Sequence, residues 1–165
     1  MESVEKMVDW ALEYVPPESK PAILEIGSGN GALLFALVVD GGYDPEAIVG
    51  VDYSPDAIQL ARLVSASKRC ERVRFEVCDF LSGPLPSCPV GPGPAPGDGW
   101  DLLLDKGTFD AIALGDREED GRSPAARYPE RVVGLLKDGG FFLITCTRVP
   151  SARAIPPSLI DSSLV

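Results

Sequence analysis

The sequence predicts an α/β fold in which a mostly parallel β-sheet is covered by helices on both faces. Short apolar runs of strand length alternate along the chain with segments whose apolar residues recur at helical spacing. This alternation favours parallel strands joined by helical crossovers. Gly27, Asp52, Asp79 and Asp105 each come at the end of an expected strand. Because ligands bind at the carboxyl ends of such strands, we expect these four positions to share one site.

In the N-terminal half, the expected order is a helix at 3–15, a strand at 22–26, a helix at 31–39, a strand at 48–52, a helix from 54 and a strand at 73–78. The first helix has apolar residues at i, i+3 and i+4 spacing, and Pro16 and Pro17 end it. The third helix has the clearest start, because Ser54 can cap it and Pro55 suits its first position. The last of these strands alternates in polarity.

In the C-terminal half, we expect a strand at 100–104, a helix at 130–136 and a strand at 141–146, all within a single domain of residues 1–165. Pro129 is expected in the first turn of that helix, because an interior proline would break a hydrogen bond. Residues 83–99 include eleven glycines and prolines, which predicts a flexible surface loop. The charged residues 115–123 predict a solvated loop, and residues 148–165 an irregular tail.

The composition excludes several function classes. A formal net charge of −10 argues against a nucleic-acid partner, because phosphate backbones are bound through Lys and Arg. It suits a small-molecule ligand or a basic protein partner, or it serves solubility alone. The absence of histidine excludes an imidazole base. Four cysteines without Cys-x-x-Cys spacing, an acidic N-terminus and no membrane-length apolar run predict a cytoplasmic location, with the nucleus as a second compartment.

The most informative segment is residues 23–31, in which an apolar strand enters the glycine turn Gly27-Ser28-Gly29-Asn30-Gly31. Glycines allow positive φ angles and close approach of a ligand, and the helix beyond presents unpaired N–H groups. We therefore expect a nucleotide or nucleoside site. Dinucleotide oxidoreductases use a related Gly-x-Gly-x-x-Gly turn with an acid about 20 positions later, which Asp52 matches. Here, however, the last glycine comes one residue early.

Other positions favour S-adenosylmethionine over a dinucleotide. Glu25 stands two residues before the glycines, where its charge would oppose a pyrophosphate and favour an ammonium or sulfonium. Asp52 suits the ribose diol of either ligand. Asp79 can accept from an adenine amino group, and the ring of Phe80 can pack on the base, although Phe80 is equally compatible with a core position.

Four motifs together indicate a family. They are Glu-Ile-Gly-Ser-Gly-Asn-Gly at 25–31, Gly-Val-Asp-Tyr-Ser at 50–54, Cys-Asp-Phe at 78–80 and Leu-Asp-Lys-Gly-Thr-Phe-Asp-Ala-Ile at 104–112. The first three resemble the class I, seven-β-strand methyltransferases, which have a Rossmann-like sheet. The fourth is similar to a signature of a subgroup of protein-lysine methyltransferases. The likeness is greatest to the methyltransferase-like protein 10 group, which trimethylates a lysine of eukaryotic translation elongation factor 1-alpha, and it covers roughly residues 5–82 and 100–147.

The resemblance implies contacts with the S-adenosylmethionine cofactor, and no metal, for residues Glu25, Gly27, Ser28, Gly29, Asn30, Gly31, Asp52, Tyr53, Asp79, Phe80 and Asp105. By position, the glutamate and the first two glycines hold the methionine end, Asp52 binds the ribose, and Asp79 and Phe80 frame the adenine. Asp105 lines the methyl-transfer site, where we expect it to act catalytically by orienting the incoming amine.

A structural alternative exists for the fourth motif, in which Lys106 and Asp110 form a local ion pair and cap the next helix. The activity that the resemblance implies is N-methylation of a lysine in a basic protein, with elongation factor 1-alpha as the suspected substrate. A non-catalytic cofactor-binding scaffold and a small-molecule methyltransferase are the alternatives.

The resemblance ends after the fifth expected strand. Class I methyltransferases of this group continue there with a helix and an antiparallel pair of strands, whereas residues 147–157 have neither helical nor alternating periodicity. We therefore expect a sheet truncated after its fifth strand. Its exposed edge would allow dimers to form.

Overall fold

The computed structural model describes residues 2–89, 99–117 and 121–145. The expected tail at 148–165, Cys146 and the middle of the expected Gly/Pro-rich loop lie outside the described residues. The same is true of part of the expected charged loop at 115–123.

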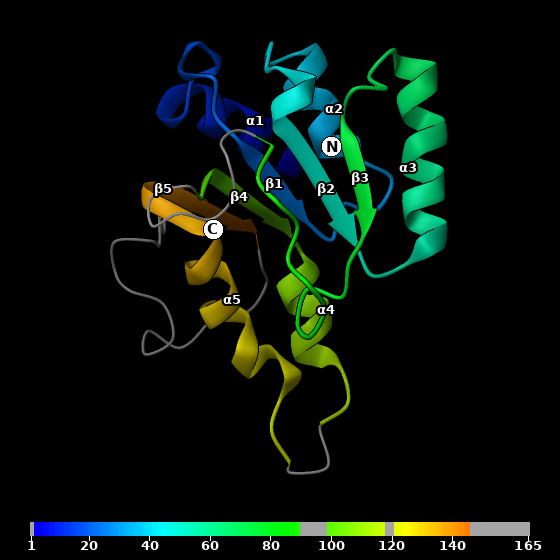
Figure 1. The fold of residues 1–165 in the computed structure, drawn as a ribbon, viewed down its shortest axis with the longest axis vertical. Coiled ribbons are helices and arrows are strands. Elements are labelled where there is room, and N and C mark those ends of the chain that lie inside the picture. Colours follow the sequence, from blue (N-terminus) through cyan, green and yellow to red (C-terminus); the bar gives the residue numbers. More distant parts are fainter. Residues whose placement is uncertain (1, 90–98, 118–120, 146–165) are drawn as a thin grey trace.

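Five strands form one parallel sheet in the order β3-β2-β1-β4-β5, with β3 and α3 at one end and β5 at the other (Figure 1). The strands are β1 Ile23–Ile26, β2 Ile48–Asp52, β3 Arg74–Val77, β4 Trp100–Lys106 and β5 Leu136–Thr145. All four pairings are parallel. The direction of strand succession reverses between β1 and β4, and this switch point is where open α/β sheets bind their ligands. The predicted fold class is confirmed.

Five helices cover the sheet: α1 Glu2–Tyr14, α2 Ala32–Val39, α3 Pro55–Lys68, α4 Thr108–Leu114 and α5 Tyr128–Leu135. The expected cap of α3 is present, since Ser54 Oγ accepts a hydrogen bond from Ala57 N at 3.3 Å. Pro129 lies in the first turn of α5, as predicted. No helix in the described part of the chain is long and apolar enough to span a membrane.

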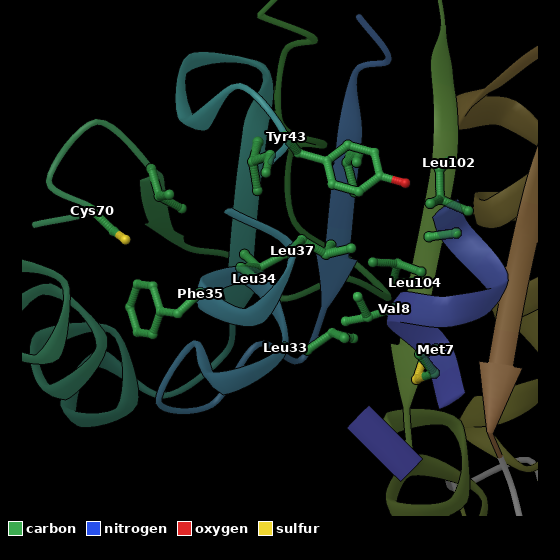
Figure 2. Packing of buried hydrophobic residues seen from close by; sticks show 14 of the residues in the cluster. Met7, Val8, Leu33, Leu34, Phe35, Leu37, Tyr43, Cys70, Leu102 and Leu104 are labelled. Carbon is green, nitrogen blue, oxygen red and sulfur yellow. The ribbon is translucent and has the colours of Figure 1, made fainter. Parts of the chain in front are cut away.

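The helices divide between the two faces of the sheet and produce two buried clusters. On one face, α1, α2 and α3 pack on the sheet through side chains such as Met7, Leu34 and Ile58. Figure 2 shows part of this cluster, with Leu33, Leu34 and Leu37 of α2 on the same face of the sheet as Met7 and Val8 of α1. On the other face, α5 contributes Tyr128 and Val132 to a cluster with Trp100 of β4. The second cluster also includes Phe80, which connects it to the carboxyl edge of the sheet.

Two strands are longer than the sequence predicted. β4 continues to Lys106, so Asp105 lies inside the sheet, level with Ile26 of β1 and Ile144 of β5. β5 begins at Leu136 rather than at 141. The glycines at 139 and 140 were expected to precede the strand, but Gly140 has room only for a hydrogen, because a Cβ would meet Trp100 O at 2.8 Å. The pairing of β4 with β5 shifts register at this point. Gly140 therefore marks a close backbone approach within the strand, whereas Gly139 has open space around it and a positive φ angle of 77°.

Candidate functional site

The glycine turn after β1 is fixed to the neighbouring strand by its backbone. Gly27 N and Ser28 N both donate to Val51 O of β2, at 2.8 and 2.9 Å. The three glycines of the turn all have positive φ angles, of 71°, 53° and 78° in chain order. Asn30 assists the start of α2, since its side-chain oxygen accepts from Ala32 N at 3.2 Å. The predicted strand–turn–helix corner is therefore present.

The three glycines are needed for different reasons. A Cβ on Gly27 would lie 1.8 Å from Thr108 Oγ1, because Thr108 at the start of α4 donates to Ile26 O at 2.9 Å. A Cβ on Gly31 would meet the rings of Phe75 and Phe35. A Cβ on Gly29 would meet nothing within 4 Å. Two of the glycines thus allow close packing inside the protein, whereas the side of Gly29 on which a Cβ would lie is open space.

Two polar side chains of this corner are buried with unused hydrogen-bonding atoms. Glu25 is 1% exposed and Ser28 is 5% exposed. Glu25 Oε2 and Ser28 Oγ have no hydrogen-bond partner among the residues that the structure describes. Burial raises the pKa of the Glu25 carboxyl well above its usual range; Lys106 opposes this shift, and Asp105 and Asp52 add to it. Buried polar atoms are normally satisfied, so this pair fits a polar, cationic ligand group such as the ammonium of S-adenosylmethionine.

Asp52, the last residue of β2, is held by backbone donors on both of its oxygens. Oδ2 accepts from Gly29 N and Oδ1 accepts from Ser54 N, each at 2.9 Å. These bonds connect the glycine turn to the start of α3 and fix the direction of the carboxylate. A carboxylate oxygen has two acceptor positions, so each oxygen retains capacity for a ribose hydroxyl. The neighbouring Tyr53 is 80% exposed.

Asp79 and Phe80 follow β3 and have distinct environments. Asp79 is exposed, and its carboxylate accepts from the Ser82 hydroxyl and from Leu81 N. The hydrogen bond from the Ser82 hydroxyl is the main cause of a pKa for Asp79 below its usual range, so this residue remains charged. Phe80 is 5% exposed, and its ring centroid lies 5.0 Å from that of Tyr128. Phe80 is therefore a core residue that also reaches the site.

These segments enclose an open cavity of about 480 Å³ at the carboxyl ends of the strands. Its volume is within the range of small-molecule sites. Five of the predicted site residues line it, namely Gly27, Asp52, Tyr53, Asp79 and Phe80. Glu25, Ser28, Gly29, Asn30, Gly31 and Asp105 are not among its lining residues.

The sequence did not identify all of the residues that line this cavity. Thr108, Ala111 and Ile112 of α4 line the cavity, together with Cys78 and Leu81 beyond β3. The α4 residues belong to the motif at 104–112, which was a recognisable signal. Nothing local in that motif, however, indicated which of its side chains would face a ligand. Apolar lining with a few polar groups at one side is typical of nucleoside sites.

Asp105 is completely buried and caps α4. Its Oδ1 accepts from Thr108 N at 2.7 Å, and its Oδ2 accepts from Phe109 N at 2.9 Å and from the Tyr128 hydroxyl. The first turn of α4 is thus capped by Asp105, whereas the expected structural alternative assigned this role to Lys106 and Asp110. Burial raises the pKa of Asp105 to about 6, and the hydrogen bonds from Tyr128, Thr108 and Phe109 limit the rise.

A parallel sheet of this order, with a glycine turn after β1 and a fixed carboxylate at the end of β2, defines a Rossmann-like nucleoside-binding protein. A family model described as a methyltransferase domain matches residues 17–162. The chain therefore belongs to this methyltransferase family.

Two relatives are similar over most of the chain. Protein-lysine N-methyltransferase efm4 of Schizosaccharomyces pombe is 36% identical over 155 residues, which cover 87% of this chain and 61% of that protein. EEF1A lysine methyltransferase 2 of Homo sapiens is 32% identical over 144 residues, which cover 87% of this chain and 54% of that protein. This chain thus spans only about half to three fifths of the length of these curated relatives.

Solved structures share the class I methyltransferase fold. The YcgJ protein of Bacillus subtilis superimposes with a TM-score of 0.64 and 22% identity, covering 92% of this chain and 53% of that one. Coclaurine N-methyltransferase, bound to N-methylheliamine and S-adenosylhomocysteine, gives a TM-score of 0.61 at 14% identity, covering 86% and 35%. At these identities the likeness describes the fold alone.

The different roles of the glycines predict different phenotypes for two alanine variants. Gly27→Ala places a methyl group against Thr108 at positive φ, so we expect it to lower the free energy of unfolding by about 2–4 kcal/mol. Gly29→Ala has only the backbone strain, about 1–2 kcal/mol, but its methyl occupies the open side of the turn and should weaken binding of S-adenosylhomocysteine at least tenfold. Denaturant unfolding measures the free energy of unfolding of each variant, and calorimetry measures its affinity for S-adenosylhomocysteine. A Gly27→Ala protein no less stable than Gly29→Ala would contradict this assignment.

The buried carboxyl of Glu25 predicts that a neutral replacement stabilises the protein at high pH. Its pKa is raised in the folded protein, so the stability that it contributes is complete below the pKa of the unfolded chain, near 4.5, and is lost as the pH rises. Glu25→Gln does not titrate. We expect its melting temperature to exceed that of the wild type by about 2–4 °C or more at pH 8, and by much less at pH 5. The exposed Glu13→Gln is the control, and equal differences at both pH values would refute the prediction.

Proposed function

We propose that this chain is the S-adenosylmethionine-binding domain of a protein-lysine N-methyltransferase that acts on elongation factor 1-alpha. The observation that carries the substrate class is the similarity to relatives named as protein-lysine and EEF1A lysine methyltransferases. The geometry of the strand ends supports the cofactor. Since the chain spans only part of those relatives, both substrate and activity are proposals for this chain.

In this proposal, different residues at the strand ends bind different parts of the cofactor. Glu25 and Ser28 offer unused buried oxygens to the methionine ammonium, with Gly27, Asn30 and Gly31 shaping the turn around that end. Asp52 accepts from the ribose hydroxyls, beside Gly29 and the exposed Tyr53. Asp79 accepts from the adenine amino group and Phe80 packs on the base. When bound, the cofactor supplies an electrophilic methyl group on a sulfonium.

The chain's contribution to transfer is to orient an amine and exclude water. We propose Asp105 as the orienting residue. Its Oδ1 accepts one hydrogen bond, from Thr108 N, within the described part of the chain, and so has capacity for one more. Asp105 is fully buried, so an amine reaches it only if neighbouring groups move, as catalytic contacts often tighten only when the substrate binds.

The substrate side of the proposal is a basic protein and not a nucleic acid. The net charge of −10 attracts a basic partner and repels phosphate backbones. The proposed location is the cytoplasm, with the nucleus as a second compartment. The free thiols of Cys70, Cys78 and Cys88 support it, because thiols stay reduced in these compartments. Within the described residues, β5 pairs with β4 alone, which leaves dimerisation through the sheet edge as a further proposal.

Incubation with methyl-labelled S-adenosylmethionine tests the function directly. We expect label to enter a lysine of purified elongation factor 1-alpha and not a variant in which that lysine is replaced by arginine. Calorimetry with S-adenosylmethionine and with a nicotinamide dinucleotide is run in parallel. Cofactor binding without transfer to any protein or small amine would support the non-catalytic scaffold, and preferential dinucleotide binding would overturn the cofactor assignment.

A matched pair of variants tests Asp105. Asp105→Asn keeps the shape of the side chain but removes the charge and one acceptor oxygen, so we expect turnover at saturating S-adenosylmethionine to fall at least tenfold, beyond any change in S-adenosylhomocysteine affinity. Tyr128→Phe removes one hydrogen bond to Asp105 and keeps the carboxylate, so turnover should stay within threefold of wild type. Single-turnover kinetics and calorimetry provide the two quantities. Full turnover by Asp105→Asn would exclude the orienting role.

A further inference from the structure

Arg131 of α5 makes three contacts with the segment that follows β3. Its Nε donates to Phe80 O at 2.8 Å, and its Nη2 donates to Gly83 O. Its guanidinium carbon also lies 5.9 Å from the centroid of the Phe80 ring, within cation–π distance. The segment that Arg131 holds includes Phe80 and Leu81, both of which line the cavity. Arg131 itself is not among the lining residues.

α5 is a fixed support for this arginine. Tyr128, one turn before Arg131, is buried and donates its hydroxyl hydrogen to Asp105 of β4. The Tyr128 ring also packs against the rings of Phe80 and Phe109, with centroid distances of 5.0 and 5.3 Å. Residues three apart on a helix share a face, so Tyr128 and Arg131 meet the same surface. The guanidinium is therefore anchored to the sheet through α5 while it holds the loop.

Apart from Arg131, the loop is held by the burial of Phe80 against Tyr128 and by short-range bonds of its own. Asp79 accepts from Leu81 N and from the Ser82 hydroxyl, and Gly83 N donates to Asp79 O at 2.7 Å. These bonds shape the turn but do not fix its position relative to the rest of the cavity. The two carbonyl contacts of Arg131 join it to a helix some fifty residues away in sequence. A planar guanidinium with a forked set of donors is well suited to fixing two carbonyls at once.

We propose that Arg131 is a positioning residue for the adenosine side of the site. By fixing the main chain of residues 80–83 and the plane of the Phe80 ring, it sets the affinity for an adenosyl ligand without contacting the ligand. This inference rests on the proposed cofactor. It assigns to α5 the support of one wall of the cavity, in addition to covering the sheet.

Arg62 provides a matched control within the same chain. It lies on α3, and its Nη2 donates to Phe75 O of β3 at 2.5 Å. It thus ties a helix to a carbonyl of the same β3 region, but Phe75 is not a lining residue of the cavity. Arg62→Met removes one guanidinium–carbonyl hydrogen bond of an exposed side chain. Arg131→Met removes two such bonds and a cation–π contact of a half-buried side chain, and of the two variants only this one releases the cavity wall.

The test is calorimetry of S-adenosylmethionine and S-adenosylhomocysteine binding to the 165-residue chain, with thermal unfolding of each variant. We expect Arg131→Met to raise both dissociation constants about tenfold or more, because the two ligands share the adenosyl group. Arg62→Met should change both dissociation constants less than twofold, with a smaller fall in melting temperature than Arg131→Met because it removes fewer contacts. Arg131→Lys keeps the charge but loses the forked pair of donors, so we expect both dissociation constants to rise by an intermediate factor of about three. This variant replaces Arg131→Met in the test if Arg131→Met does not fold.

A purely structural role for Arg131 would give equal dissociation constants for Arg131→Met, Arg62→Met and the wild type at a temperature where all are folded, and that result overturns the inference. Where methyl transfer is measurable, Arg131→Met should raise KM for S-adenosylmethionine and change kcat less than twofold. A wild-type chain that binds neither ligand overturns the proposed function and this inference together. A wild type that binds, with an unaffected Arg131→Met, overturns the inference alone.

Discussion

The site depends on one contact across the switch point of the sheet, the hydrogen bond from Thr108 to the last carbonyl of β1. It brings the start of α4 so close to the glycine turn that position 27 has room only for a hydrogen. Asp105 completes this junction by capping the same turn of α4 from within β4. Because α4 is held at the end of β1 and lines the cavity with Thr108, Ala111 and Ile112, the motif at 104–112 positions one of the cavity walls.

This arrangement places acidic side chains in buried or nearly buried positions within a small region. Burial raises the pKa of both Glu25 and Asp105, and the Asp52 carboxylate adds to the shift of Glu25. Such groups reduce stability when they are unpaired, which is expected where a protein retains charge for a cationic ligand. The three carboxylates differ in how they are satisfied: Asp52 and Asp105 accept backbone bonds, whereas Glu25 has an unused oxygen in the described structure. Glu25 is thus the group with most to gain from a bound ammonium.

The second face of the sheet takes part in the site as well as in the core. Tyr128 joins β4, α4 and the segment after β3 through one hydrogen bond and several ring contacts, and Arg131 extends the same support to the main chain around Phe80. A bulky aromatic cluster with its single hydroxyl satisfied is stable in a core and rigid beneath a binding surface. The stability of this face of the sheet and the geometry of the cavity are therefore coupled, because Tyr128 and Arg131 contribute to both.

The sequence alone determined the α/β class, the position of all five strands, the glycine corner and the carboxylate of Asp52, because these follow from local periodicity, capping and turn chemistry. The lengths of β4 and β5 were underestimated from the sequence, because a strand that contains a charged residue or two glycines has no clear alternating pattern. Only the tertiary structure decided that Gly27 is required by Thr108, that Asp105 is a buried cap, and that Arg131 supports the Phe80 wall. The contacts of Thr108 and Arg131 join segments some fifty to eighty residues apart, and spacing along the chain does not encode which of them will meet. The capping bonds of Asp105 are local, but its burial and its bond to Tyr128 depend on another element.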